Sequence, residues 1–124
     1  MFRPTQRIVE IKKFIIETIK ATGADACPPY IVGVGIGGTA DYAMLLAKKA
    51  LLRTTVSSSK LQVSRLEKEL LKEINKLNIG PMGLGGKTTA LSVNIETYPT
   101  HIAGLPVAIN ISCHALRSAA KILR

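Results

Sequence analysis

Apolar residues recur at two different spacings along this chain of 124 residues. Over residues 5–21 isoleucines return at every third or fourth position, which is the spacing of an amphipathic helix. A short apolar run over residues 30–34 follows and is typical of a buried strand. Because such helices and strands must bury their apolar faces against each other, the pattern predicts helices packed on a small mixed sheet. We therefore expect an α/β fold, with α+β as the alternative.

The same spacings predict the remaining elements. Further helices are expected over residues 42–52, after an N-cap at Thr39, over residues 59–77, after a cap at Ser59, and over residues 115–123. Further strands are expected over residues 88–98 and 105–111. In the first of these, apolar residues alternate with Ser92, Asn94 and Glu96, which predicts a strand buried on one face only. No repeat or linker interrupts the chain, so residues 1–124 are expected to form a single domain.

The charge balance restricts the classes of partner. The chain has 17 Lys and Arg residues against 8 Asp and Glu residues, a formal net charge of +9, which attracts anions and acidic surfaces. Nucleic acid is not favoured as a partner, because the basic residues are scattered over helices and the chain has three Tyr, two Phe and no Trp. Charged helix faces in solvent, together with a surface for an acidic partner, would also account for the excess of basic residues. With no membrane-spanning run and no signal-peptide pattern, a cytoplasmic protein without membrane contact is expected.

Two glycine-rich segments stand out. GPMGLGGKTTA, beginning at Gly80, resembles a phosphate-binding loop, but Pro81 occupies the position of that motif's first glycine and a helix is predicted to precede it. The other segment, residues 33–38, fits G-x-G-x-x-G, yet no acidic residue lies between Asp41 and Glu67 to bind a ribose. Neither segment therefore favours a nucleotide. For residues 35–38 we expect a glycine turn, either for close approach to another ligand, which is favoured, or for steric reasons only.

Two cysteines and one histidine could carry chemistry. Cys27 precedes Pro28 and Pro29 in a predicted loop, and Cys113 lies where a predicted strand gives way to a helix, a position that favours a thiolate. A structural disulfide is not expected in a chain without an export signal. The thiols are then either ligands of a shared metal site or inert core residues. His101, in a predicted loop, is either an acid, base or anion contact or a surface residue.

Three long stretches, in this order, resemble one known family. Residues 26–39 contain the Cys-Pro-Pro and glycine motifs, residues 78–88 contain the second glycine segment, and residues 99–114 run from Pro99 through His101 to Cys113 and His114. Together they resemble the class I, iron-sulfur fumarate hydratases, in particular the alpha subunit of the two-subunit form. The alpha subunit of L-tartrate dehydratase is a close relative of that subunit.

The resemblance implies a cofactor and a set of site residues. It implies a 4Fe-4S cluster held by three cysteines, with one iron open to the substrate; Cys27 and Cys113 match two of these ligands, and the third lies in a family region upstream of this chain. His101 matches a histidine that contacts a substrate carboxylate. The glycine segments match stretches that line the substrate site, which here are Gly35, Gly37, Gly38, Thr39, Gly85, Gly86 and Lys87.

The implied activity is that of a hydro-lyase which interconverts fumarate and malate. Two alternatives remain: an alpha-type subunit of tartrate dehydratase, and a non-catalytic binding or assembly module that keeps the fold. The chain resembles the C-terminal part of the alpha region, so the implied partners are an N-terminal alpha region and a beta subunit. On this basis the isolated chain is expected to be inactive and to form a homo-oligomer, with Cys27 and Cys113 close together in space.

Overall fold

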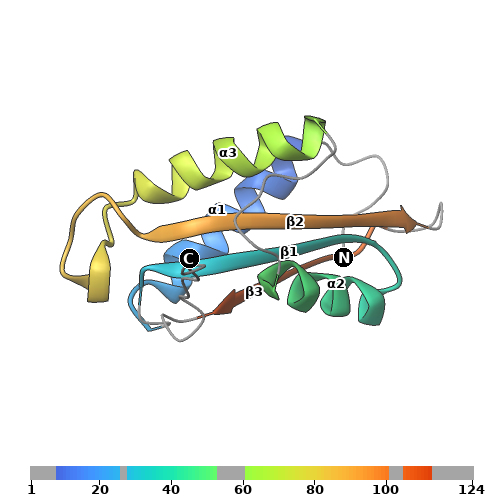
Figure 1. Cartoon of the computed structure of the whole chain (residues 1–124), viewed down its shortest axis with the longest axis horizontal. Coiled ribbons are helices and arrows are strands. Elements are labelled where there is room, and N and C mark those ends of the chain that lie inside the picture. Colours follow the sequence, from blue (N-terminus) through green and yellow to red (C-terminus); the bar gives the residue numbers. More distant parts are fainter. Residues whose placement is uncertain (1–7, 26–27, 53–60, 101–104, 113–124) are drawn as a thin grey trace, which may run out of the picture.

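The computed structural model describes residues 8–25, 28–52, 61–100 and 105–112 (Figure 1). Within these ranges the chain forms three α-helices, three strands and one short 3-10 helix. The elements are α1 (Ile8–Thr22), β1 (Tyr30–Gly38), α2 (Ala40–Leu52), α3 (Leu61–Asn75), η1 (Pro81–Gly83), β2 (Ala90–Thr100) and β3 (Val107–Ser112). The helix expected over residues 115–123 and the Ser59 cap lie outside the described residues.

The three strands form one mixed sheet in the order β2-β1-β3. β1 runs parallel to β2, with Val34 opposite Ile95, and antiparallel to β3, with Val34 opposite Ile109. A parallel pair needs a crossover connection, and the segment that contains α2 and α3 provides it. The predicted fold, helices on a small mixed sheet, is confirmed.

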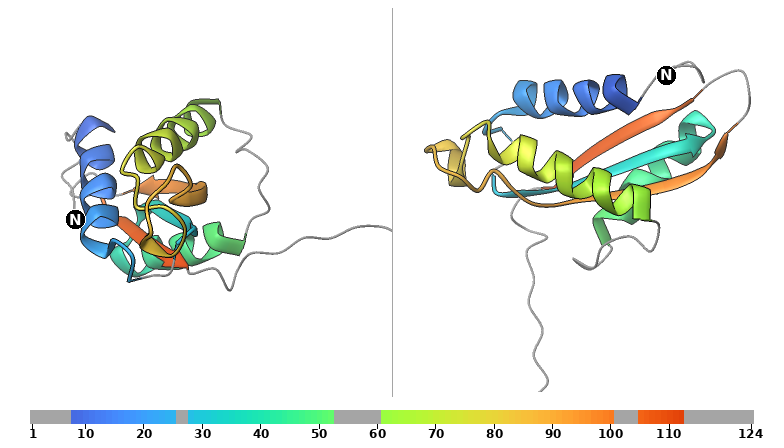
Figure 2. Two further views of the ribbon diagram at one scale, coloured as in Figure 1. Left: turned by 90° about the vertical axis from the view of Figure 1, so that its left-hand side faces the viewer. Right: turned by 90° about the horizontal axis from the view of Figure 1, so that it is seen from above.

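Helices cover both faces of this sheet: α1 and α3 lie on one face and α2 on the other (Figure 2). On the α1 and α3 side, the helical stripes meet the apolar side chains of the strands in one buried core. Its members are Ile11, Ile15, Ile19, Tyr30, Val32, Val34, Leu70, Ile74, Ala90, Val93 and Ile95. The apolar stripes that predicted the first and third helices are therefore the surfaces that bury the sheet. None of the helices that the structure describes is long and apolar enough to cross a membrane.

The first glycine segment differs from the expected turn, because β1 continues through it as far as Gly38. Gly33 and Gly35 face α2, and a Cβ atom on Gly35 would meet the carbonyl oxygen of Ala43 and, at 2.9 Å, the Cβ atom of Leu46. A Cβ atom on Gly33 would likewise meet the backbone of α2, at the carbonyl of Ala47. These glycines let the helix backbone lie directly on the strand, so the segment forms a strand rather than a turn.

The expectation that β2 is buried on one face only is wrong. Ser92 and Asn94, predicted to be on the open face, are buried, while Leu91 is 41% exposed. Ala90 pairs with Tyr30 and Ser92 with Ile31, so Leu91 is the additional residue of a bulge. The Asn94 amide nitrogen donates a hydrogen bond of 2.9 Å to the carbonyl of Ala50 near the end of α2. This bond gives a carbonyl near the end of α2 a hydrogen-bond donor. It also gives the buried Asn94 side chain a partner, so a polar residue can lie on the face of the sheet that α2 covers.

Candidate functional site

Each of the three stretches singled out in the sequence has a part at the end of the sheet where β1 begins. The backbone nitrogen of Met82, in the second glycine segment, donates a hydrogen bond of 2.7 Å to the carbonyl of Pro28. At the same end, Ser112, the last residue of β3, pairs with Ile31. Cys27 directly precedes Pro28 and Cys113 directly follows Ser112, but both cysteines lie outside the described residues. The chain segments that flank the two thiols thus lie at one end of the sheet.

The second glycine segment forms a closed loop, residues 79–88, which we call the glycine loop. Gly85 donates from its backbone nitrogen to the carbonyl of Ile79 at 2.8 Å, and Gly80 donates to the hydroxyl of Thr89 at 3.1 Å. Gly80 has φ of 71°, and a Cβ atom there would meet the backbone of Gly85 and lie 2.7 Å from the nitrogen of Gly86. Glycine is therefore required for the loop to close on itself. The loop follows the helix α3, not a strand, in accord with the rejection of a nucleotide loop.

A cationic pocket of about 610 Å³ lies beside the glycine loop, at the carboxyl end of α3. We call it the lysine pocket; its lining residues are Lys72, Asn75, Lys76, Asn78, Lys87 and Thr88. The Asn75 side-chain oxygen fixes the loop to the sheet, because it accepts hydrogen bonds from the backbone nitrogens of Thr89 (2.8 Å) and Ala90 (2.9 Å). Of the predicted site residues, Lys87 lines this pocket. Lys72 and Lys76 were missed, although lysines at the end of a predicted helix in a chain of charge +9 were a usable signal.

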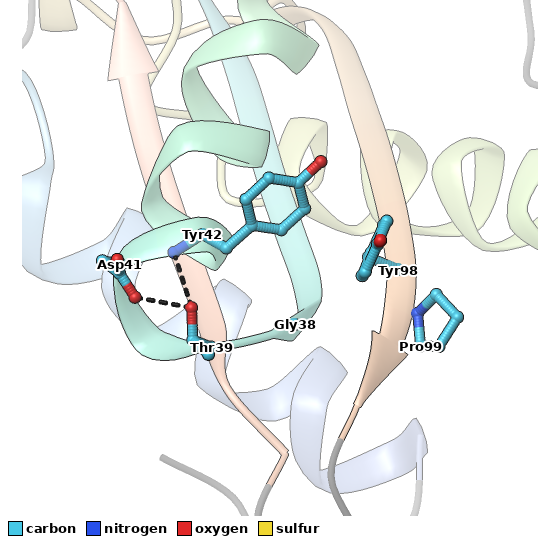
Figure 3. Close-up of a pocket in the computed structure, with 6 residues that line it drawn as sticks. All are labelled: Gly38, Thr39, Asp41, Tyr42, Tyr98 and Pro99. Carbon is cyan, nitrogen blue, oxygen red and sulfur yellow. Dashed lines mark hydrogen bonds between the residues drawn. The ribbon is translucent and has the colours of Figure 1, made fainter.

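A second pocket, of about 390 Å³, lies at the opposite end of β1 (Figure 3). We call it the tyrosine pocket; it is lined by Gly38, Thr39, Asp41, Tyr42, Tyr98 and Pro99. The rings of Tyr42 and Tyr98 meet edge to face, with centroids 4.8 Å apart and planes at 67°. The pocket includes two of the predicted site residues, Gly38 and Thr39, and lies at the carboxyl ends of the two parallel strands, where ligands commonly bind in α/β sheets.

Glycine at the end of β1 shapes this pocket. The pairing with β2 shifts between Gly37, opposite Tyr98, and Gly38, opposite Thr100. Gly38 has φ of 70°, and a Cβ atom there would lie 2.7 Å from the ring of Tyr42. The small residue therefore lets the chain turn sharply into α2 beneath that ring.

The N-terminus of α2 places a negative charge in the tyrosine pocket. The Thr39 hydroxyl accepts a hydrogen bond from the backbone nitrogen of Tyr42 at 3.4 Å, which confirms the predicted N-cap, and donates one to the Asp41 carboxylate at 2.5 Å (Figure 3). The hydrogen bond from Thr39, with support from the backbone N–H groups of Asp41 and Tyr42, lowers the pKa of the Asp41 carboxyl. Asp41 is therefore ionised at neutral pH. Asp41 thus gives the tyrosine pocket a negative charge, whereas three lysines line the lysine pocket.

The predicted site residues thus fall into two groups at opposite ends of the sheet. Gly85, Gly86 and Lys87 lie at the same end of the sheet as Pro28 and Ser112, whereas Gly38 and Thr39 lie at the other end. The eight residue steps of β1 from Tyr30 to Gly38 separate the two ends by about 26 Å. His101 follows Thr100, the last residue of β2, and lies outside the described residues. Gly35 and Gly37 lie in β1, against Ala43 and the Tyr98 carbonyl respectively. Within the described ranges, no three His, Cys, Asp or Glu side chains are grouped to hold a metal ion, and the assigned roles stay predictions.

The comparisons with known proteins agree with the resemblance seen in the sequence. The fumarate hydratase (Fumerase) family model matches residues 1–121. The chain therefore belongs to the fumarate hydratase family, which is a family of hydro-lyases.

Among its relatives is the putative L(+)-tartrate dehydratase subunit alpha of Methanocaldococcus jannaschii, which is 53% identical over 122 residues. That alignment covers 98% of this chain and 43% of the relative. The L(+)-tartrate dehydratase subunit alpha of Escherichia coli K12 is 36% identical over 115 residues, which cover 92% of this chain and 38% of the relative. The chain thus spans less than half the length of these relatives.

Proposed function

We propose that this chain is part of the alpha subunit of an iron-sulfur hydro-lyase that interconverts fumarate and malate. The family match over residues 1–121 supports the reaction class. The observation that carries the proposal is the meeting of Pro28, the glycine loop and Ser112 at one end of the sheet, since the residues next to Pro28 and Ser112 are the two cysteines.

The residues present are compatible with an iron-sulfur cluster as far as the described chain reaches. Cysteine thiolates are the usual protein ligands of such clusters. Cys27 and Cys113 are the chain's two cysteines, and the described neighbours of both lie at the same end of the sheet. Cys27 and Cys113 would thus be two of the ligands, with the third supplied from outside this sequence. When bound, the cluster supplies an iron that acts as a Lewis acid on the substrate hydroxyl.

The chain's own residues would bind and orient the dicarboxylate. The glycine loop presents a backbone held in one conformation by the bonds between Gly85 and Ile79 and between Gly80 and Thr89. Lys87, at the end of that loop, adds a cation that attracts a carboxylate. His101 would contact a substrate carboxylate. A preorganised, positively charged surface stabilises the negative charge that builds up on the substrate when its proton is removed.

L-Tartrate is the second candidate substrate, because the relative from M. jannaschii, named as a putative L(+)-tartrate dehydratase subunit, is 53% identical over almost the whole chain. Malate and tartrate are both 2-hydroxy dicarboxylates, so the same carboxylate contacts would serve either one. The reactions differ in product, since loss of water from malate gives fumarate and loss of water from tartrate gives the enol of oxaloacetate. Product analysis therefore distinguishes the two substrates.

The active form would include further chains. The relatives are named as alpha subunits, and this chain corresponds to 43% and 38% of them, so the proposed partners are the remaining part of an alpha subunit and a beta subunit.

The test combines all three parts, loads them anaerobically with iron and sulfide, and assays malate, fumarate and L-tartrate. We expect turnover of one hydroxy acid, loss of turnover in Cys27→Ser and Cys113→Ser, and no turnover by this chain by itself. A complex that binds the cluster but turns over none of these compounds would instead support a non-catalytic binding module.

A further inference from the structure

Three lysines and no acidic residue are among the residues that line the lysine pocket. The Lys76 Nζ atom, directly after the end of α3, lies 3.7 Å from the Glu73 Oε1 atom in the last turn of that helix. In the part of the chain that the structure describes, Lys72 and Lys87 have no carboxylate partner. The pocket therefore holds an excess of positive charge that its own surroundings do not neutralise.

Helix energetics accounts for only part of this arrangement. Lys72 and Lys76 lie at the carboxyl end of α3, where cations are stabilised by the helix dipole whether or not a ligand binds. Lys87 is different, because it comes from the glycine loop and not from the helix, yet it lines the same pocket. It adds a further cation to the pocket, and no ion pair within the described residues offsets its repulsion of the other two lysines.

Asn75 adds a fixed hydrogen-bond donor to the same pocket. Its side-chain oxygen accepts two backbone N–H groups, from Thr89 and Ala90. Only the oxygen of an amide can accept, so these two bonds fix which way the side chain is turned. The amide nitrogen of Asn75 then carries two N–H groups that have no acceptor among the described residues. A preoriented donor in a pocket lined by lysines suits an oxyanion, which accepts several charge-assisted hydrogen bonds at once.

We propose that the lysine pocket binds the oxyanion group of a small dianionic ligand, a carboxylate or a phosphate. Lys72, Lys87 and the amide nitrogen of Asn75 are the groups that contact it. In the proposed hydro-lyase the occupant is one carboxylate of the dicarboxylate substrate, and this assignment of the occupant rests on the proposed function. Binding of an oxyanion as such does not depend on it.

Variants of the complete chain of 124 residues distinguish binding at this pocket from a general attraction of anions to the net positive charge. Asn75→Asp keeps an oxygen that accepts from Thr89 and Ala90 but replaces the N–H donors with a second, negatively charged oxygen. Lys72→Gln with Lys87→Gln removes two cations from the pocket. The matched control is Lys48→Gln with Lys49→Gln, which makes the same change of charge at exposed positions of α2, on the other face of the sheet.

The experiment titrates inorganic phosphate and malate, in separate series at low ionic strength, into the chain without a cluster and follows the backbone amide resonances by NMR. We expect saturable shifts around the lysine pocket with at least one of the two ligands. Affinity should fall about tenfold or more in Asn75→Asp and in the Lys72, Lys87 pair, because charge-assisted hydrogen bonds are lost. The Lys48, Lys49 control should bind like the unchanged chain, and thermal melting should show that the Asn75→Asp chain remains folded.

Shifts that rise linearly without saturation, or an equal loss in the control, would overturn the proposal, because both indicate attraction to net charge only. Saturable binding of phosphate without binding of malate would support the oxyanion site and refute the dicarboxylate as its occupant. Since the readout is binding to a chain without a cluster, failure here is distinct from failure of the proposed hydro-lyase activity.

Discussion

Ser92 and Asn94 lie two residues apart on the same face of β2, and both are buried. Asn94 donates a hydrogen bond to the carbonyl of Ala50, whereas the hydroxyl of Ser92 has no hydrogen-bond partner in the part of the chain that the structure describes. Replacing Asn94 with alanine leaves that carbonyl without its donor, so we expect the free energy of unfolding to fall by about 1–3 kcal/mol. Chemical denaturation measures the change.

The Ser92→Ala variant is the internal control for that prediction. It removes a buried hydroxyl that makes no bond within the described residues, so stability should stay within about 0.5 kcal/mol or rise slightly. Equal destabilisation by the two substitutions would contradict the assigned roles, since it would show that burial alone decides the effect.

Thr39 caps α2 through its hydroxyl, so loss of the hydroxyl should weaken the helix. Thr39→Ala is expected to lower the free energy of unfolding by about 1 kcal/mol, which is the usual cost of losing an N-cap. Thr39→Ser keeps the hydroxyl and should remain close to the original stability. If the serine variant were as unstable as the alanine variant, the methyl group rather than the cap would be responsible.

The same hydroxyl makes the titration of Asp41 sensitive to residue 39. The hydrogen bond from Thr39 is the largest cause of the lowered pKa of the Asp41 carboxyl in the folded chain. A lowered folded pKa stabilises the protein above the ordinary aspartate pKa, and this contribution is lost as the pH falls through the folded value. In Thr39→Ala the pKa of Asp41 should rise toward its ordinary value, as NMR titration of the carboxyl carbon can measure. An unchanged pKa would show that the backbone N–H groups dominate.

At the scale of elements, the spacing of apolar residues was sufficient to predict an element that has one buried face. The isoleucine stripe of α1 and the apolar stripe of α3 each predicted a helix. Ile11, Ile15, Ile19, Leu70 and Ile74 from these stripes are buried, but so are Ser64 and Glu67 of α3, which the apolar pattern did not include. Periodicity did not predict that the second face of the sheet is also covered, because the position of α2 depends on contacts between residues that are far apart in the sequence. The alternation of Gly33 and Gly35 with Val32 and Val34 was a usable signal, since it marks one apolar face and one face against which a backbone packs.

Close packing of α2 on β1 leads to a prediction at this scale. Gly35→Ala places a methyl group against the carbonyl of Ala43 and the side chain of Leu46, neither of which can move without shifting α2. We expect a loss of about 1–3 kcal/mol or more in the free energy of unfolding, measured by denaturation. Ala21→Leu, a larger addition at an exposed position of α1, should cost less than about 0.5 kcal/mol. Tolerance of Gly35→Ala would indicate that α2 does not pack directly on the strand.

At the scale of the whole molecule, apolar side chains remain exposed on several elements. Val9 on α1 is 70% exposed and Leu84 on the glycine loop is 88% exposed, and Phe14, Met44 and Leu52 are exposed as well. Exposed apolar surface costs about 25 cal/mol per Å², and the charge of +9 is screened over about 8 Å at physiological salt. We therefore expect the isolated chain to self-associate at high micromolar concentration, and Val9→Gln with Phe14→Gln to reduce the association in sedimentation. A strictly monomeric chain would contradict this.

The candidate site could be predicted from the sequence only in part. Its motifs identify the family and the residues to consider, but their spacing along the chain does not tell which of them meet. The sheet order decides this: because β3 runs antiparallel to β1, Ser112 returns to the end where Pro28 and the glycine loop lie. Because β2 runs parallel to β1, Thr100 is carried to the other end, beside Gly38. Strand pairing of this kind is a long-range property that a local pattern does not contain.

The central claim is that Cys27 and Cys113 belong to one site at the beginning of β1. The most direct test treats the chain with a short crosslinker specific for thiols and maps the products by mass spectrometry. The comparison variant combines Cys113→Ser with Tyr98→Cys, which moves the second thiol to the tyrosine-pocket end of the sheet, about 23 Å from Tyr30 for the seven residue steps of β1 to Gly37. We predict an intramolecular crosslink between Cys27 and Cys113 and none in the comparison variant. Single modification of both native cysteines without a crosslink, or equal crosslinking in both proteins, would contradict it.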